Sequence, residues 1–277
     1  MIWNDIYKNS VDLLMQAGVA SATHDAKELA EYSFGRVPFA SETPDSDQLA
    51  MYDDAIERRA QRVPLQHIIG KMWFRFLELE SRPGVFITRP ETELVAQAAI
   101  DELQKLIQSG VEHPRVVDLC AGSGAIAIAI ATEVPHADVS AVELSKTAFA
   151  SIEQNNKRYG GRVRLVHGNA LDFNDPAGTG YDVVVSNPPY VPATHKLSEE
   201  VLADPSMALF GGGEDGLEFP EKLIDHVATL VKTDGLFIME HADEQGKVLR
   251  DYASHFFRKC GTGQDYNGSD RWLWARK

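Results

Sequence analysis

The chain has 277 residues, of which 44% are hydrophobic and 25% are charged, and its formal net charge is −14. This composition is ordinary for a globular protein and excludes a disordered chain, and the length suits one large domain or a large and a small one. The acidic balance disfavours a polyanion as the main partner, because the lysines and arginines form no long cluster that could bind phosphates.

The start of the chain carries no recognisable targeting signal. Residues 1–5 (MIWND) lack the basic and apolar regions of a secretory signal peptide, and no apolar run is long enough to span a bilayer. The two cysteines, Cys120 and Cys260, are too far apart in the sequence to suggest a disulfide framework or a metal site. We therefore expect a soluble, cytoplasmic protein with no membrane partner and no metal.

Residues 1–63 are expected to form a small helical domain. Apolar residues recur at helical spacing over residues 2–18, 25–34 and 46–62, and glycines stop the first two helices. No catalytic group stands out in this part of the chain. We interpret it as a domain that recognises a substrate, and a purely structural cap is the alternative.

Residues 64–90 are expected to form a β-hairpin that links the helical domain to the rest of the chain. Apolar residues at 74–79 and 85–87 predict two strands. The sequence RPG at 82–84 lies between them and is typical of a turn.

A helix is expected to follow this linker. Residues 88–91 (TRPE) match the capping box that opens a helix, with proline tolerated in the first turn. The helix should run to about residue 108. The cap uses the threonine and the glutamate, and it leaves Arg89, Thr92 and Glu93 without an assigned role.

The remaining residues, 91–277, are expected to form one domain in which strands and helices alternate. Strands are predicted at 116–119, 139–142, 163–166, 183–185 and 236–239, and helices at 125–132, 146–158 and 218–231. Such alternation predicts a mostly parallel sheet with helices on both faces. Apolar residues at 255–257 and 272–274 flank a glycine-rich stretch, so the sheet should close with an antiparallel hairpin.

A turn containing two glycines follows the first strand of this sheet. In residues 118–124 (DLCAGSG) the glycines let the backbone approach a ligand at the carboxyl edge of the strands. About twenty residues further on, Glu143 ends the next strand, where a carboxylate can accept both hydroxyls of a ribose. A turn without a ligand and a solvated glutamate are the alternatives.

The third strand ends on the same edge with His167, Gly168, Asn169 and Ala170. This segment could read an adenine ring, and an ordinary turn is the alternative. Sites that bind nucleotide phosphates usually have more glycines, or a lysine as in a P-loop. The pattern therefore favours a nucleoside without phosphates, and S-adenosylmethionine is the obvious one.

The fourth strand ends in a rigid polar corner, residues 183–191 (VVVSNPPYV). Pro188 and Pro189 have a fixed φ angle and no N–H group, so the corner presents hydrogen-bond acceptors. Asn187 adds a side-chain carbonyl, and Tyr190 adds an aromatic wall. We interpret the corner as a cradle for a planar group with an NH2, either a carboxamide or the amino edge of a base. A strand end that only turns the chain is the alternative.

These motifs resemble those of class I S-adenosylmethionine-dependent methyltransferases. Within that class, residues 64–70 (PLQHIIG) and 84–93 (GVFITRPETE) closely resemble the HemK-type peptide chain release factor N5-glutamine methyltransferases. Residues 208–217 and 271–276 resemble the same family. The related ribosomal-protein glutamine methyltransferases typically differ in the RPETE segment, which favours a release factor as the substrate.

The resemblance implies a Rossmann-like class I methyltransferase sheet that uses S-adenosylmethionine. The implied substrate is the N5 amide of the glutamine in the Gly-Gly-Gln motif of class 1 peptide chain release factors. The residues expected to bind the cofactor are Cys120, Ala121, Gly122, Ser123, Gly124, Glu143, Asn169, Ala170 and Asn187. The residues expected to bind the glutamine are Asn187, Pro188, Pro189 and Tyr190, of which Asn187, Pro188 and Tyr190 are the expected catalytic residues.

Three positions depart from the family pattern. Cys120 stands where the family usually has glycine, Glu143 replaces a commoner aspartate, and Thr88 replaces a commoner proline. None of these changes removes a group that the chemistry needs.

Two other functions stay open at this point. An N6-adenine methyltransferase of DNA or RNA would use the same corner for a flipped base. A module that binds but does not turn over is disfavoured by the presence of Asn187 and Tyr190. For the methyltransferase we expect a monomer that forms no stable complex with nucleic acid.

Overall fold

The computed structural model describes all 277 residues, and the chain forms two compact units. One unit comprises Met1–Lys71, Ser81–Pro83 and Leu197–Ala203, and the other comprises Met72–Glu80, Gly84–Lys196 and Asp204–Lys277. Each unit has its own hydrophobic core. The domain division at 63/64 and 90/91 stays a prediction.

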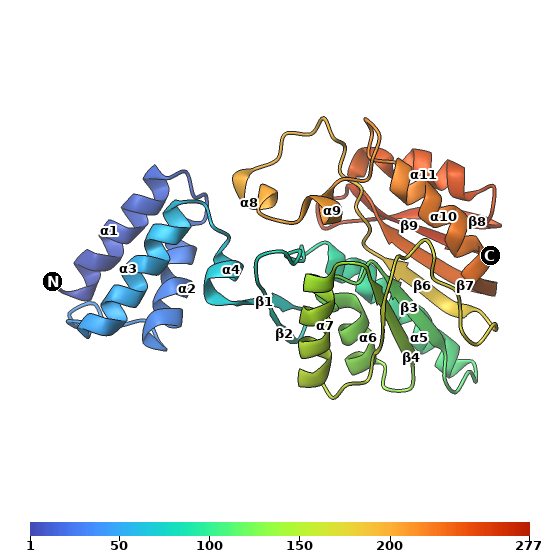
Figure 1. Ribbon diagram of the computed structural model, residues 1–277, viewed down its shortest axis with the longest axis horizontal. Helices are drawn as coiled ribbons and strands as arrows, with labels where there is room; N and C mark the ends of the chain where they lie inside the picture. Colours follow the sequence, from blue (N-terminus) through green and yellow to red (C-terminus); the bar gives the residue numbers. More distant parts are fainter. The chain divides into compact units, whose positions relative to one another are not determined.

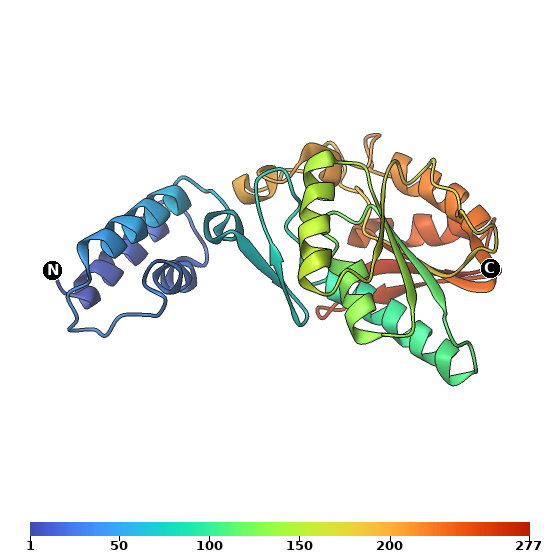
Figure 2. The ribbon, with the colours of Figure 1, turned by 60° about the horizontal axis from the view of Figure 1, so that its bottom comes forward.

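The first unit is helical, as the sequence predicts. Its helices are α1 (Trp3–Gln16), α2 (Ala22–Phe34), α3 (Ser46–Ala60), α4 (Leu65–Ile69) and the short α8 (Glu199–Leu202) (Figures 1 and 2). The rings of Phe34 and Tyr52 pack edge-on against Trp3 at 5.3 and 5.1 Å. Arg59 donates to Asp25 at 2.7 Å inside the core, so two buried charges compensate each other.

The β-hairpin is present, but its turn is not where the sequence analysis places it. The strands are β1 (Lys71–Phe74) and β2 (Leu77–Glu80), which pair with each other. Residues 83–84 do form a turn, but it follows β2 rather than joining the two strands, and the predicted strand at 85–87 is wrong because those residues have no strand structure.

Contacts within the large unit explain the position of this turn. Arg75 has a positive φ of 52°, which a non-glycine residue adopts only with support from its surroundings. Its backbone N–H donates to Glu93 at 2.8 Å, and its guanidinium donates to Glu133 at 2.6 Å. These partners lie far away in the sequence, so no local turn signal marks Arg75.

The large unit contains the mostly parallel sheet that the sequence predicts. Its strands are β3 (Arg115–Leu119), β4 (Asp138–Glu143), β5 (Arg164–His167), β6 (Tyr181–Ser186), β7 (Val231–Glu240), β8 (Lys259–Gln264) and β9 (Asp270–Arg276). They lie in the order β5-β4-β3-β6-β7-β9-β8. Strands β3 to β7 are parallel, whereas β9 runs antiparallel to β7 and to β8.

The C-terminal hairpin is confirmed, but the strand predicted at 255–257 is wrong. Those residues follow helix α11 (Gly246–Ala253), which the sequence analysis does not include, and β8 begins only at Lys259. A Cβ atom on Gly261 would lie 2.4 Å from the ring of Trp274. Glycines in β8 therefore make room for tryptophan rings on β9, and they are strand residues rather than a turn.

Helices cover both faces of the sheet (Figure 1). One face packs against α5 (Thr92–Gln108), α6 (Ala125–Glu133) and α7 (Lys146–Arg158), and the other packs against α10 (Glu218–Leu230) and α11. Along β6, Val183 and Val185 pack in the core on the α5–α7 face of the sheet, and Val184 packs in the core on the α10–α11 face. This alternation follows from the two-residue period of a strand, and it explains why the run of valines is buried on both sides.

Helix α5 begins at Thr92, three residues after the start that the predicted capping box implies. The residue before the helix is Glu91, which makes no side-chain capping bond, and the Thr88 hydroxyl lies 3.6 Å from the sulfur of Met72. Arg89 donates to Asp204 at 2.5 Å. This contact with a distant carboxylate keeps residues 88–91 out of the helix, so the capping-box prediction is wrong.

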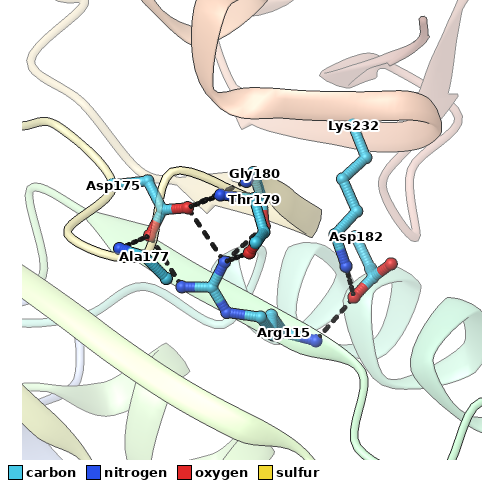
Figure 3. Close-up of polar contacts among 7 residues, drawn as sticks. All are labelled: Arg115, Asp175, Ala177, Thr179, Gly180, Asp182 and Lys232. Atoms are coloured by element: carbon cyan, nitrogen blue, oxygen red, sulfur yellow. Dashed lines mark hydrogen bonds and ion pairs between the residues drawn. The ribbon is translucent and has the colours of Figure 1, made fainter.

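The amino ends of three strands are fastened together around Arg115 (Figure 3). Its guanidinium donates to both oxygens of Asp175, at 2.7 and 2.9 Å. Its backbone N–H donates to Asp182 at 2.7 Å, which also accepts from Lys232 at 2.8 Å. The Arg115 guanidinium holds the pKa of Asp175 well below its usual range. Strands β3, β6 and β7 are thereby held in register, so their carboxyl ends lie at one edge.

Candidate active site

A pocket lies at the carboxyl edge of the sheet, beside β3. The chain order reverses on either side of β3, and open α/β sheets bind ligands at such a point. The pocket contains several residues that the sequence predicts for the site: Cys120, Ala121, Gly122, Ser123, Glu143, Asn169, Ala170, Asn187 and Pro189. The other lining residues are Gly84, Phe86, Thr88, Thr92, Asp118, Ala125, Ile126, Val142, Leu144, Ser145, Ala148, Gly168, Pro205, Met207, Ala208 and Phe219. Gly124, Pro188 and Tyr190 do not line it.

The loop from β3 to α6 forms the floor of the pocket with a left-handed backbone. Cys120, Gly122 and Gly124 have φ values of 62°, 56° and 86°. A Cβ on Gly124 would lie 2.5 Å from the side chain of Ile152, so this glycine permits close packing under the loop rather than ligand contact. Cys120 adopts a conformation that favours glycine, and burial raises the pKa of its thiol.

Glu143 ties this loop to the end of β4. Its carboxylate accepts the backbone N–H of Gly122 at 2.7 Å and that of Ser145 at 2.6 Å. Burial raises the pKa of Glu143, and the two N–H donors act in the opposite direction. Each carboxylate oxygen has a second lone pair, so the group can also accept from a ligand in the pocket.

Asp118 is a polar residue of the pocket that the sequence analysis treats only as part of the loop. Its Oδ2 accepts the N–H of Ala127 at 3.1 Å, whereas its Oδ1 is buried without a hydrogen-bond partner. The hydroxyl of Ser123 is also buried without a partner. Burial raises the pKa of Asp118 well above its ordinary value. Unpaired polar atoms beside a pocket mark places where a ligand or water completes the hydrogen bonding.

The end of β5 contributes backbone more than side chains. Asn169 uses its side chain locally, since Oδ1 accepts the N–H of Leu171 at 3.0 Å and Nδ2 donates to Asp172 at 3.0 Å. His167 does not line the pocket, and its Nε2 lies 3.0 Å from the carbonyl oxygen of Leu144. A ligand ring at this wall would therefore meet Ala170 and the backbone of Gly168 and Asn169.

The cradle at the end of β6 is divided between the pocket and the protein interior. Asn187 and Pro189 line the pocket, and the Nδ2 of Asn187 donates to the Thr92 hydroxyl at 3.1 Å. The hydroxyl of Tyr190 donates to Glu240 at 2.8 Å. Tyr190 thus supports the cradle from outside the pocket, and its contact with a substrate stays a prediction.

The segment that follows the cradle packs closely against it. The N–H of Gly211 donates to the carbonyl of Val191 at 3.2 Å. A Cβ on Gly216 would lie 2.2 Å from the carbonyl oxygen of Tyr190. The buried side chain of Gln245 donates to that same carbonyl at 2.8 Å. No sequence pattern predicts these contacts, and only the repeated glycines indicate close backbone packing.

No group of three or more His, Cys, Asp or Glu side chains is arranged to hold a metal ion. None of the helices combines the length and the apolar character needed to cross a bilayer.

Comparison with known proteins identifies relatives over the whole chain. Residues 77–217 match the family model of the Methyltransferase small domain, and residues 5–70 match that of the PrmC N-terminal domain. A release factor glutamine methyltransferase from Bifidobacterium longum is 39% identical over 296 residues, with 99% of each chain covered. Another from Streptomyces coelicolor is 45% identical over 237 residues, which is 84% of this chain and 82% of that one.

Solved structures share the sheet of the large unit. A Thermus thermophilus 16S rRNA N2 G1207 methyltransferase, in complex with AdoMet and guanosine, has a TM-score of 0.53 and 18% identity. The alignment covers 75% of this chain and 49% of that chain. At this level of identity the likeness concerns the fold alone.

Proposed function

The chain belongs to the release factor glutamine methyltransferase family, and from that premise we propose that its pocket and cradle methylate the glutamine of a class 1 release factor. The protein uses S-adenosylmethionine to methylate a glutamine of a release factor. The finer proposal is that this glutamine is the one in the Gly-Gly-Gln motif and that the methyl group goes to its N5 amide.

The residues of the pocket fit S-adenosylmethionine. The Glu143 carboxylate can accept hydroxyls of the ribose, and Ala170 offers an apolar contact for the adenine. The unpaired Oδ1 of Asp118 can accept from the amino group of the methionine part. When bound there, S-adenosylmethionine supplies a methyl group that is activated by a positively charged sulfur.

The cradle can compensate for the weak nucleophilicity of the substrate's amide nitrogen. An amide nitrogen is a poor nucleophile because its lone pair is delocalised into the carbonyl. We assign the Asn187 side-chain oxygen and the Pro188 carbonyl as acceptors of the two amide N–H groups. Holding both protons orients the nitrogen toward the methyl group and stabilises the positive charge that develops on it. With S-adenosylmethionine bound, methyl transfer would form the N–C bond as the C–S bond breaks with its electron pair left on sulfur, and the nitrogen would lose one proton to water.

One observation carries this proposal. Asn187 and Pro189 line the same pocket as Glu143 and Gly122, so the acceptor for the amide and the acceptor for the ribose share one cavity. A methyltransferase of nucleic-acid adenine could use a similar corner, but the relatives covering this chain are release factor enzymes and its net charge of −14 disfavours a polyanion.

The experiment replaces Asn187 with alanine and follows transfer of radiolabelled methyl to intact release factor. Turnover should fall roughly 10²–10³-fold, as for the loss of one preorganised polar group from an oxyanion hole. Asn174, which is exposed and bonds only within its own loop, provides the matched control Asn174→Ala. Near-normal turnover by Asn187→Ala, or efficient methylation of DNA or RNA in parallel reactions, would contradict the proposal.

The proposal also concerns how the enzyme meets its substrate. We assign residues 1–63 to recognition of the folded release factor, and we take the enzyme to act as a cytoplasmic monomer without stable nucleic-acid binding. Light scattering of the enzyme alone, and of the enzyme mixed with RNA, measures both the oligomeric state and the absence of such a complex.

A further inference from the structure

A line of polar side chains runs from the partly buried cradle to two buried residues, Thr92 and Glu240. Asn187 Nδ2 donates to the hydroxyl oxygen of Thr92 at 3.1 Å, and the Tyr190 hydroxyl donates to Glu240 Oε1 at 2.8 Å. Thr92 and Glu240 are each only 1% exposed. Burial raises the pKa of Glu240, and the neighbouring Thr92 and Tyr190 hydroxyls oppose that shift, while Oε2 of Glu240 forms no hydrogen bond.

The chemistry of these groups fixes the direction of the hydrogen bonds. A carboxylate can only accept, whereas a hydroxyl has one proton to donate and lone pairs to accept. If the Thr92 proton is directed to Glu240, its oxygen is left to accept from Asn187, and only the amide nitrogen of Asn187 can donate. The Asn187 oxygen is then the atom that is left for a ligand.

We propose that Thr92 and Glu240 are positioning residues that present the oxygen of the Asn187 amide, rather than its nitrogen, to the substrate. The proposal rests on the proposed function, in which that oxygen accepts an N–H of the glutamine. The two ends of an asparagine amide have nearly the same size and shape, so packing alone selects poorly between them. With the amide reversed, NH2 would face NH2, and the substrate nitrogen would lose one of its two acceptors.

The burial of Glu240 supports a role beyond packing. A buried carboxylate is costly to desolvate, and an oxygen without a normal partner makes this one costlier. An apolar residue at the end of β7 would avoid that cost. Thr92 also lies in the RPETE segment, at a position to which the capping box assigns no role. Orienting the Asn187 amide would explain why Thr92 and Glu240 occupy these positions.

The test compares Thr92→Val, which keeps the shape and removes the hydroxyl, with Thr92→Ser, which keeps the hydroxyl. Turnover of Thr92→Val on intact release factor should fall roughly 10–100-fold, as expected for a misplaced reacting group. Thr92→Ser should recover most of that loss. Because Thr92 also lines the pocket, turnover is compared at saturating S-adenosylmethionine, with the affinity of each variant measured by calorimetry. Thr132→Val is the matched control, because the Thr132 hydroxyl bonds only to the backbone of its own helix at 2.8 Å.

A double-mutant cycle separates orientation of Asn187 from a general structural role. In an Asn187→Ala background, Thr92→Val should cause little further loss, because the side chain that it orients is gone. If Thr92→Val does not fold, Glu240→Gln replaces it in the same double-mutant cycle. Additive losses in the cycle, equal losses for serine and valine at position 92, or normal turnover by Thr92→Val would each overturn the inference.

The turnover of Asn187→Ala distinguishes a failure of the positioning role from a failure of the proposed function. If Asn187→Ala is inactive while Thr92→Val and Glu240→Gln turn over normally, the positioning role fails and the proposed function stands. If Asn187→Ala itself turns over normally, the proposed function fails, and the positioning role fails with it.

Discussion

Glu143 shows how one carboxylate can shape the site before it meets a ligand. Its two oxygens accept backbone N–H groups from the glycine loop and from the start of α7, so it joins β4 to both. We expect Glu143→Ala to weaken S-adenosylmethionine binding by about 1–3 kcal/mol, the usual loss for hydrogen bonds to a charged group. Calorimetry on the folded variant measures this. Glu102→Ala is the control, since Glu102 pairs with Arg276 at 2.8 Å and does not line the pocket. Equal affinities of the unaltered protein and Glu143→Ala would show that Glu143 does not bind the cofactor.

The ionisation of Glu240 should appear in the pH dependence of turnover. Burial raises the pKa of Glu240 above the ordinary 4.5, and the charge of Glu91 adds to that shift, whereas Thr92, Tyr190 and Arg271 oppose it. A raised pKa means that the carboxyl group keeps its proton to a higher pH than an ordinary glutamate does. The protonated group can donate to Thr92 and reverse the direction of the hydrogen bonds.

Turnover at saturating cofactor should therefore decline as the pH falls through a value above 4.5, and Glu240→Gln should lack this acid limb. The effect on stability has the opposite sign, because the folded state binds this proton more tightly than the unfolded state and gains stability on acidification. Glu143 also has a raised pKa, and saturating cofactor prevents its protonation from changing turnover through weaker cofactor binding. An identical acid limb in Glu240→Gln would assign the limb to another group.

At the scale of elements, the segment between β6 and α10 holds the cradle by backbone contact. Gly216 has a φ of 74°, and a Cβ there would lie 2.2 Å from the carbonyl of Tyr190. Gly178 has a similar φ of 66°, but nothing lies within 4 Å of a Cβ at that position. Alanine would therefore strain the backbone at either position, but only at Gly216 would it also collide with the cradle.

Gly216→Ala should lower turnover roughly 10²-fold, because the backbone of the cradle must shift by an appreciable fraction of an ångström or more. Gly178→Ala should cost about 1 kcal/mol of stability through its positive φ and leave turnover near normal. Steady-state kinetics and urea denaturation of both variants test this pair. A cradle insensitive to Gly216→Ala would mean that the segment can move away from Tyr190 freely.

The sequence predicts elements well where local pattern and tertiary environment agree. The alternation of valines in β6 and the strand–loop–helix around the glycine loop are local features, and both are correct. The turn at Arg75 is different, because it depends on Glu93 and Glu133, and the start of α5 depends on Asp204. No short-range signal encodes those partners.

The same limit applies to the candidate site. Asn187 and Glu143 are found from sequence because each ends a strand at a known edge of the sheet. Thr92 and Glu240 come from elements separated by more than a hundred residues, and only the parallel pairing of β6 with β7 and the packing of α5 bring them to the cradle. A role that consists of orienting another side chain has no sequence pattern of its own.

At the scale of the whole molecule, the hairpin belongs with the large unit, which contains the candidate active site. Met72, Phe74, Leu77 and Leu79 lie in the core that the sheet shares with α5 and α6. A chain shortened inside the hairpin would therefore expose apolar surface and fold poorly. The cut that preserves this core comes before Lys71, after the glycine that ends α4.

Such a shortened chain, 71–277, tests the role proposed for the helical residues. We expect it to bind S-adenosylmethionine with near-normal affinity, because every residue that lines the pocket remains. It should lose most methylation of intact release factor and keep slow methylation of short Gly-Gly-Gln peptides, since those peptides need only the cradle. Circular dichroism and cofactor calorimetry establish folding before the rates on the two substrates are compared.

One contact requires a control for this experiment. Glu200 on α8 accepts from Arg62 at 2.6 Å and from Arg59 at 3.1 Å, and these arginines lower the pKa of Glu200 to about 2. Removal of the first 70 residues therefore also removes the partners of α8. Glu200→Ala in the full chain loosens α8 while it keeps the helical residues. If this variant methylates intact release factor normally and the shortened chain does not, recognition belongs to residues 1–63. If Glu200→Ala alone reproduces the loss, the helices serve to hold α8, and the assignment of recognition to them is wrong.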